Sequence, residues 1–302
     1  MRVIPPIDIT DAKLVSSSVP EDDYAEWDVG TTYALGDKVI LTSTHKVYES
    51  VQAGNTGHAP TDETTEVPVW WLDLGYTNRW KMFDLYRNTQ TAGATYIEIE
   101  VELGERVDSV ALVGLAGDTA TITMVSDNVV VYSKVIALTI RQTSSWYDYF
   151  FESFGILPAV AAFDLPPFTN ATITVRIDGA LGAACGSIVF GKSEYLGQVE
   201  LQAVSDALNF SVVERDAFGN STLVPRKSVP KTNQTLMAAK DTTNKLILLR
   251  NDLNAKPAVW SGLDDATDGY FNALLILGYY RQFLISLEYP QHTLVQLELE
   301  EI

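Results

Sequence analysis

The chain has 302 residues, of which 46% are hydrophobic and 20% are charged, a composition typical of folded globular proteins rather than disordered ones. Its formal net charge of −18 disfavours nucleic acid and anionic membranes as partners, because both are negatively charged. The single cysteine, Cys185, cannot form an internal disulfide, and no apolar run is long enough to span a membrane. The N-terminal residues lack the pattern of a signal peptide, so we expect folding in a cytosol.

Residues 1–23 contain two adjacent prolines and three consecutive serines, which predict an irregular arm, either loose or laid over a neighbour. The next stretch, residues 24–75, combines aromatic residues with turn signals. Gly36 and Asp37 predict a turn, because glycine accepts positive φ and aspartate bonds the backbone ahead of it. Val39 and Tyr48 suit short strands beside turns. So small a unit buries little core, so its aromatic residues must supply most of its stability.

This spacing resembles the small chitin- and cellulose-binding modules of carbohydrate-binding families 5 and 12. The residues that carry the resemblance are Trp27, Tyr33, Gly36, Asp37, Val39, Tyr48, Pro60, Trp70, Trp71 and Gly75. The resemblance implies a three-stranded module, and aromatic rings of this kind stack on the apolar face of a pyranose. The candidate carbohydrate-binding residues are Trp27, Tyr33, Tyr48, Trp70 and Trp71. In the alternative interpretation these rings form the module's core. Residues 51–54 lack the exposed aromatic pair of chitin-binding members, so we expect any sugar binding to be weak.

Residues 76–84 are apolar and aromatic, which predicts a packed connector. From Thr95 the apolar residues recur with a period of two, as is typical of a half-buried strand. Further strands are expected over residues 110–115, 119–125, 129–135, 172–177 and 186–190, with a turn at residues 127–128. The regular spacing of short strands predicts an antiparallel β-sandwich of jelly-roll type over residues 76–195.

Residues 196–302 predict a third region that is rich in β-structure and contains one helix. Strands are expected over residues 199–204, 208–213, 222–229, 273–279, 283–289 and 294–299, with a hairpin turn at residues 218–220. The helix is expected to be capped by Thr232 or Asn233, to carry apolar residues at helical spacing from Leu236 to Leu253, and to end before Pro257. The predicted fold is therefore mainly β, in three parts behind an N-terminal arm.

The second and third regions resemble tail proteins of long-tailed bacterial viruses. The segments that carry this resemblance are residues 225–228, 248–251, 257–262 and 277–280, followed by a final β pair. The resemblance implies a structural protein of a tail tip or baseplate that is made in the host cytoplasm and located in the virion. Its expected partners are other tail proteins, further copies of itself in a ring or hub, and host surface glycan at residues 24–75.

The histidines and the cysteine give no indication of catalysis. His45, His58 and His292 lack metal-ligand spacing, which favours surface or turn positions over a metal site. Cys185 lies among alanines and glycines, which favours a buried small residue over a nucleophile. We therefore expect no cofactor and no metal.

Paired carboxylates are the remaining option for an enzyme. Glu98, Glu100 and Glu102 are the candidates for a glycosidase pair, but their alternation predicts a solvated strand face rather than a cleft. Asp264, Asp265 and Asp268 form an acidic loop that is a candidate calcium site, although its spacing matches no complete calcium-binding loop. We expect a protein without catalytic activity. The alternatives are a polysaccharide-degrading enzyme or a lectin with a chitin-binding-like module.

Overall fold

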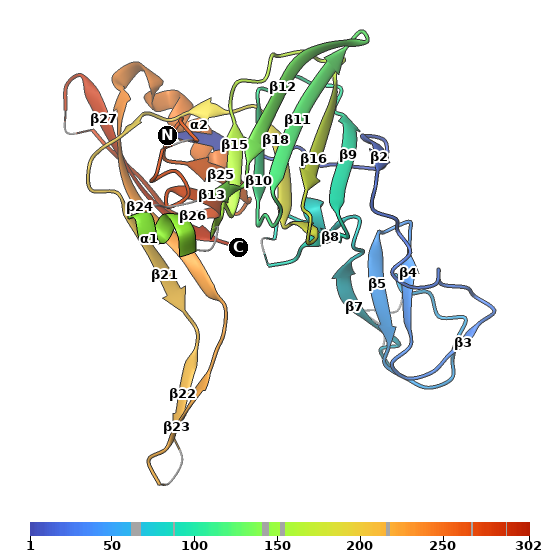
Figure 1. Ribbon diagram of the computed structural model, residues 1–302. Coiled ribbons are helices and arrows are strands. Elements are labelled where there is room, and N and C mark those ends of the chain that lie inside the picture. Colours follow the sequence, from blue (N-terminus) through green and yellow to red (C-terminus); the bar gives the residue numbers. More distant parts are fainter. Residues whose placement is uncertain are drawn as a thin grey trace.

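The computed structural model describes residues 1–61, 68–86, 88–140, 145–151, 155–215, 218–266, 268–287 and 289–302. The chain is mainly β and built from antiparallel sheets, as the sequence predicts. Figure 1 shows the N-terminal module at one end, a sandwich in the middle and a C-terminal sheet at the other end, from which a long hairpin projects.

The N-terminal module is a three-stranded antiparallel sheet with one short additional strand pair. The sheet has the order β4 (Lys38–Leu41), β5 (Lys46–Ser50) and β7 (Trp71–Tyr76), and β3 (Thr32–Tyr33) pairs with β6 (Asn55–Thr56). The predicted turn is present, because Gly36 has a φ of 88° and the Asp37 carboxylate accepts a hydrogen bond of 2.7 Å from the Ala34 amide. The three-stranded sheet expected here is confirmed.

The middle region is a β-sandwich of eight strands in two antiparallel sheets. The five-stranded sheet has the order β12 (Val129–Ala137), β11 (Thr119–Ser126), β16 (Thr172–Asp178), β9 (Tyr96–Glu102) and β2 (Leu14–Ser17). The three-stranded sheet has the order β15 (Ala159–Ala162), β10 (Ser109–Val113) and β18 (Ser187–Gly191). Alternate residues such as Ile97, Ile99 and Val101 are fully buried between the sheets. The predicted β11–β12 turn is confirmed by positive φ at Asp127 and Asn128.

Smaller elements complete the sandwich and the connector. They are the 3₁₀ turn η1 (Lys81–Phe83), the pair β8 (Thr91–Gly93) and β17 (Ala183–Cys185), the pair β13 (Thr139–Ile140) and β14 (Gly155–Ile156), and the short helix α1 (Trp146–Phe151). Cys185 lies in the sandwich core, and burial raises the pKa of its thiol well above the ordinary value. The expected buried position of this cysteine is therefore confirmed.

The C-terminal region is built on an eight-stranded sheet. Its main path has the order β19 (Glu194–Tyr195), β1 (Arg2–Ile4), β25 (Ala258–Ser261), β26 (Leu275–Ser286), β27 (His292–Glu301), β24 (Ser228–Ala239) and β20 (Gln198–Val199), and β21 (Val204–Asn209) also pairs with β24. The turn η2 (Lys240–Thr242) leads into α2 (Thr243–Asp252), which packs Leu246 and Leu249 onto the sheet. Fully buried Trp260 donates a hydrogen bond of 3.0 Å to the carbonyl of Gly278.

The helix begins later than the sequence predicts. Residues 228–239 form strand β24, and the predicted caps Thr232 and Asn233 lie inside that strand. Alternate residues from Thr232 to Ala238 are buried, and β24 pairs with β27 from Lys231 to Ala239. The apolar residues here fit the periodicity of a helix as well as that of a strand, and the long pairing with β27 favours the strand. The predicted end of the helix before Pro257 is correct.

Residues 1–23 are also more regular than the sequence predicts. Strand β1 pairs with β19 and β25 in the C-terminal sheet, whereas β2 pairs with β9 in the sandwich. Pro5 and Pro6 lie between these strands, where the chain crosses from one sheet to the other. Strands this short are recognisable mainly through their partners, which lie far away in the sequence. The arm therefore ties two parts of the molecule together.

Several predicted strand boundaries also change. Residues 273–279 and 283–289 were expected as separate strands, but most of both belongs to the single strand β26, whose register with β27 shifts between Tyr280 and Gln282. Residues 200–203 separate β20 from β21, and β22 (Val212–Arg215) and β23 (Ser221–Val224) form the tip of the projecting hairpin. Proline accounts for one boundary, because β23 ends immediately before Pro225.

Candidate carbohydrate-binding module

Three of the five candidate rings form the core of the module. Tyr33, Tyr48 and Trp71 are buried together with Val39, and Trp71 retains only 1% exposure. The rings of Tyr33 and Trp71 meet edge to face, with centroids 5.2 Å apart. Since their faces are covered, a pyranose cannot stack on these three rings in this structure. These three rings therefore form the module's core, as the alternative interpretation of the sequence has it.

The polar atoms of the buried rings are also used within the module. The Tyr33 hydroxyl accepts a hydrogen bond of 2.7 Å from the Asp28 amide, and the Trp71 indole donates one of 2.8 Å to the His58 carbonyl. Such bonds are needed when an aromatic ring with a polar atom is buried. They hold the loops on either side of the small sheet.

Trp27 and Trp70 retain partial exposure and pack against this core from outside. One face of Trp70 is covered by the His58 ring, whose plane is tilted by 12° and whose centroid lies 4.0 Å away. Among the five candidate rings, Trp27 and Trp70 are thus the two that a sugar could stack on. His58 was expected to be a turn residue, and nothing in its sequence neighbourhood predicts this contact.

The outer side of strand β7 adds exposed apolar surface next to the module core. Leu72, Leu74 and Tyr76 alternate along this edge strand and are all exposed. Leu72 lies opposite Glu49 of β5, and the Lys46 ammonium lies 5.6 Å from the centroid of the Tyr76 ring. This strip runs from the module towards its junction with the sandwich.

His45 fixes the module at that junction, a role that the sequence did not predict. It occupies the β4–β5 turn with a φ of 57°, and its ring stacks on Trp80 of the connector at 3.9 Å. Its Nδ1 lies 3.0 Å from a Glu21 oxygen and its Nε2 lies 3.1 Å from an Asp11 oxygen. The Thr77 amide donates to the His45 carbonyl. All these partners are distant in sequence, so spacing alone could not reveal the cluster.

The candidate carboxylates of an enzyme have structural partners. Glu98 forms an ion pair of 3.0 Å with Arg176 on the neighbouring strand β16, and Glu100 accepts a hydrogen bond from Ser16. Both glutamates lie on the outer face of β9, opposite the buried residues. The predicted solvated strand face is confirmed.

The described residues of the acidic loop show no arrangement for calcium. Asp264 forms an ion pair of 2.9 Å with Arg2, and the residues that the structure describes include no group of three or more His, Cys, Asp or Glu side chains placed to hold a metal ion. Among the same residues, no helix has the length and apolar character needed to cross a membrane.

Comparisons with known proteins do not assign a family. No protein-family model matches the chain, and a search of curated proteins finds no significant match.

Proposed function

We propose that the protein is a structural component of a phage tail tip or baseplate that assembles with copies of itself and with other tail proteins. The observation that carries this proposal is the projecting hairpin of residues 204–231, which we call the hairpin arm. Figure 1 shows its distal strands, β22 and β23, extending away from the C-terminal sheet.

The hairpin arm exposes apolar side chains that its own chain leaves uncovered. Phe210, Val213 and Leu223 are exposed along the ribbon, and Phe218 near its tip is 91% exposed. An isolated two-stranded ribbon is only marginally stable in water, and clustered apolar surface marks sites of protein contact. The arm is therefore suited to lie on another protein.

Charge favours a second copy of this chain as that protein. Residues 204–231 contain four basic and three acidic residues, whereas the rest of the chain contains 17 basic and 36 acidic residues. A slightly positive arm is attracted to a strongly negative body. Contact between the arm of one copy and a different surface of the next is head-to-tail, and such contacts generate rings when the rotation closes.

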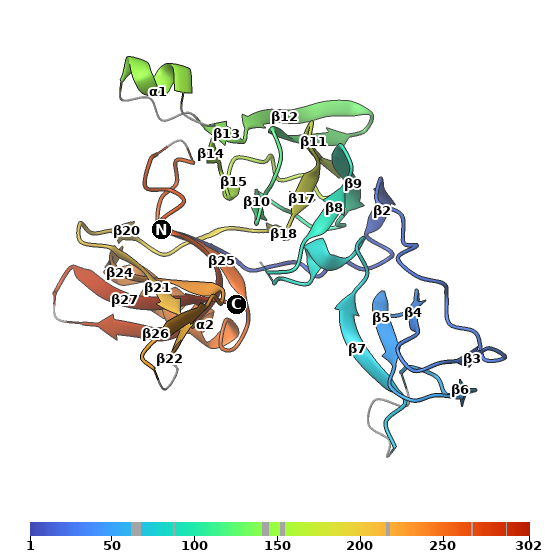
Figure 2. The same ribbon diagram turned by 60° about the horizontal axis from the view of Figure 1, so that its bottom comes forward.

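Helix α1 offers a second surface for tail partners. Trp146, Tyr147, Phe150 and Phe151 are all exposed on this short helix. Figure 2 shows α1 standing apart from the sheets. Exposed aromatic residues of this kind are enriched at the centres of protein interfaces.

Glycan contact by the module is a further part of the proposal. Trp27 and Trp70 supply the partly exposed rings, and one or two stacking contacts correspond to about millimolar affinity. A ring of subunits compensates for weak individual sites, because linked sites see a high effective concentration. We propose no catalytic activity, since Glu98 and Glu100 are engaged in strand contacts.

The assembly proposal is tested by shortening the hairpin arm. Residues 210–226 are replaced by a two-residue Asn-Gly turn, which leaves the pairing of β21 with β24 intact. Light scattering after size exclusion should show an oligomer for the wild type and a monomer for the shortened chain. Substitution of exposed Leu181, which lies outside the arm, by Ser serves as the control. A monomeric wild type at about 100 μM, or an unchanged oligomer after shortening, contradicts the proposal.

A further inference from the structure

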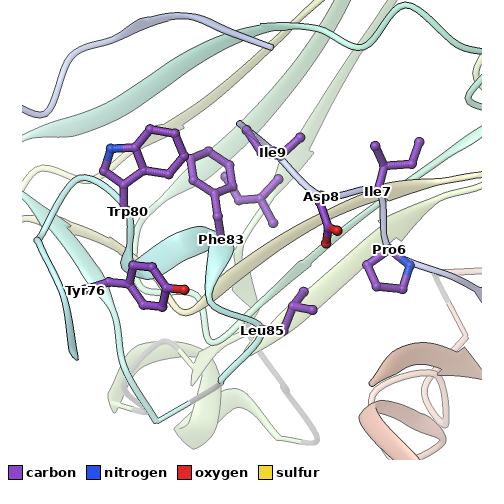
Figure 3. A pocket seen from close by; sticks show the side chains of 9 residues that line it. Pro6, Ile7, Asp8, Ile9, Tyr76, Trp80, Phe83 and Leu85 are labelled. Atoms are coloured by element: carbon purple, nitrogen blue, oxygen red, sulfur yellow. The ribbon is translucent and has the colours of Figure 1, made fainter. Parts of the chain in front are cut away.

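We propose that the pocket where the connector meets the N-terminal arm is a binding site for a single neutral pyranose. This inference rests on the glycan contact proposed above but assigns it to different residues. Figure 3 shows the pocket, which has a volume of about 220 Å³. Its principal lining residues are Pro6, Asp8, Tyr76, Trp80, Phe83 and Leu85.

The lining combines aromatic and aliphatic walls with two polar groups. Figure 3 shows the Asp8 carboxylate and the Tyr76 hydroxyl directed towards the same space. Neither group has a hydrogen bond or ion pair with any side chain or backbone atom among the described residues. Apolar pockets with a few convergent polar groups are the usual form of small-molecule sites. The two groups are therefore available to a ligand.

The wall of the pocket includes a residue in an unfavourable conformation. Leu85 has a φ of 63°, in the left-handed region that residues with a Cβ atom rarely adopt. Its side chain also packs against the core shared by β10, β15 and β25. Backbone strain of this kind persists where the surrounding structure demands it and is concentrated at binding sites. It positions Leu85 opposite Asp8 in the pocket.

The charges around the pocket favour a neutral ligand. The Asp8 carboxylate repels an anion, and it accepts hydrogen bonds without donating any. The Lys46 ammonium, which forms an ion pair of 2.6 Å with Asp73, already lies over the Tyr76 ring, 5.6 Å from its centroid, so that face of the ring is not open to a second cation. A neutral ligand that donates hydrogen bonds to Asp8 and has an apolar face for Tyr76 or Phe83 meets these conditions.

A pyranose has this chemistry and this size. Its hydroxyls donate to a carboxylate, and its C–H face packs on an aromatic ring. The pocket is smaller than the roughly 300–1,000 Å³ of sites for drug-sized molecules, which limits it to one ring. The exposed strip of Leu72 and Leu74 on β7 ends at Tyr76, so the rest of a longer glycan would pass along the module.

The site is tested by NMR saturation transfer with glucose, galactose, mannose and N-acetylglucosamine, each added to the full-length protein. Choline and glucuronate are tested in the same way as a cationic and an anionic ligand. We expect at least one neutral sugar to bind. Asp8→Asn should weaken it about tenfold or more, as expected for loss of a hydrogen bond to a charged group. Tyr76→Phe should weaken it about threefold to tenfold, as expected for a neutral one.

Matched controls are Asp22→Asn and Tyr96→Phe, which alter exposed residues outside the pocket and should bind as the wild type does. Failure of every neutral sugar to bind, preference for choline or glucuronate, or unchanged binding by both pocket variants overturns the inference. So does binding that is lost in Trp70→Ala but retained in Asp8→Asn, because the sugar then occupies the module. Oligomer mass is measured on the same samples, so failure of this site is distinguished from failure of assembly.

Discussion

The N-terminal module and the sandwich bury their apolar side chains in cores of very different size. Among the residues that the structure describes, the module's core cluster comprises four buried residues, Tyr33, Val39, Tyr48 and Trp71, whereas that of the sandwich comprises 25 and is mostly aliphatic. With so few core positions, the module needs large rings to bury sufficient apolar area. The same rings are then no longer available to a ligand. A family-like aromatic pattern in so small a unit therefore says more about its stability than about sugar binding.

The largest expected effect in this comparison is that of removing Trp71. Because this ring is one of four core residues, Trp71→Ala should destabilise the module by about 3–5 kcal/mol. Hydrogen exchange should show faster opening of β4 and β5, while the amides of β11 and β16 in the sandwich remain protected. Trp70→Ala, at a half-buried ring, is the matched control and should cost clearly less. Equal costs for the two variants would mean that Trp70 belongs to the core.

The contact between module and connector is expected to depend on His45. His45→Ala removes the stacking on Trp80 and the contacts with Glu21 and Asp11, and loss of a hydrogen bond to a charged carboxylate costs about 1.5–3 kcal/mol. The expected result is greater mobility of the module relative to the sandwich, measured by NMR relaxation. Exposed His292 provides the control through His292→Ala. Identical relaxation in wild type and His45→Ala would show that other contacts hold the module.

A smaller, pH-dependent effect is expected at Asp84 in the connector. Burial raises the pKa of this carboxyl above its ordinary value, against the opposing hydrogen bonds from Thr89 and the Tyr86 amide. The folded state therefore binds more protons than the unfolded state, and stability decreases as the pH rises from the ordinary aspartate pKa through the raised one. Across this pH window, the melting temperature of the wild type should fall relative to that of Asp84→Asn. A difference that does not vary with pH would contradict this.

The smallest effect on the rest of the chain is expected from removing the module. Its two ends meet, because the Asp23 carboxylate accepts a hydrogen bond of 3.1 Å from the Asn78 amide. Domains whose termini are close can be excised with little disturbance. Deletion of residues 24–75 should leave a protein that unfolds cooperatively and still assembles, as judged by thermal melting and light scattering. Loss of the cooperative transition would show that module and sandwich share one core.

Strands with strict alternation could be predicted, and those with ambiguous periods could not. In β9, Ile97, Ile99 and Val101 face the core while glutamates face water, and this pattern fits no helix. In β24, Leu236 and Ala239 fit helical spacing as well, and pairing with β27 decides the outcome. The sequence predicts that the five candidate rings belong to one small module, and the structure places them in and around one core cluster. Which of these rings are buried depends on how β5 and β7 pair, and the local sequence does not determine that pairing.

The sequence by itself determined the mainly β fold, the turn at Gly36 and the interior position of Cys185, because each follows from local period, backbone preference or composition. Only the tertiary structure decided that residues 1–23 join two sheets, that Trp71 is buried while Trp70 is half-buried, and that Asp8 and Tyr76 line one pocket. These outcomes depend on contacts between residues far apart in the chain. Side chains acquire such neighbours only when the sheets pair, and no local pattern encodes that choice.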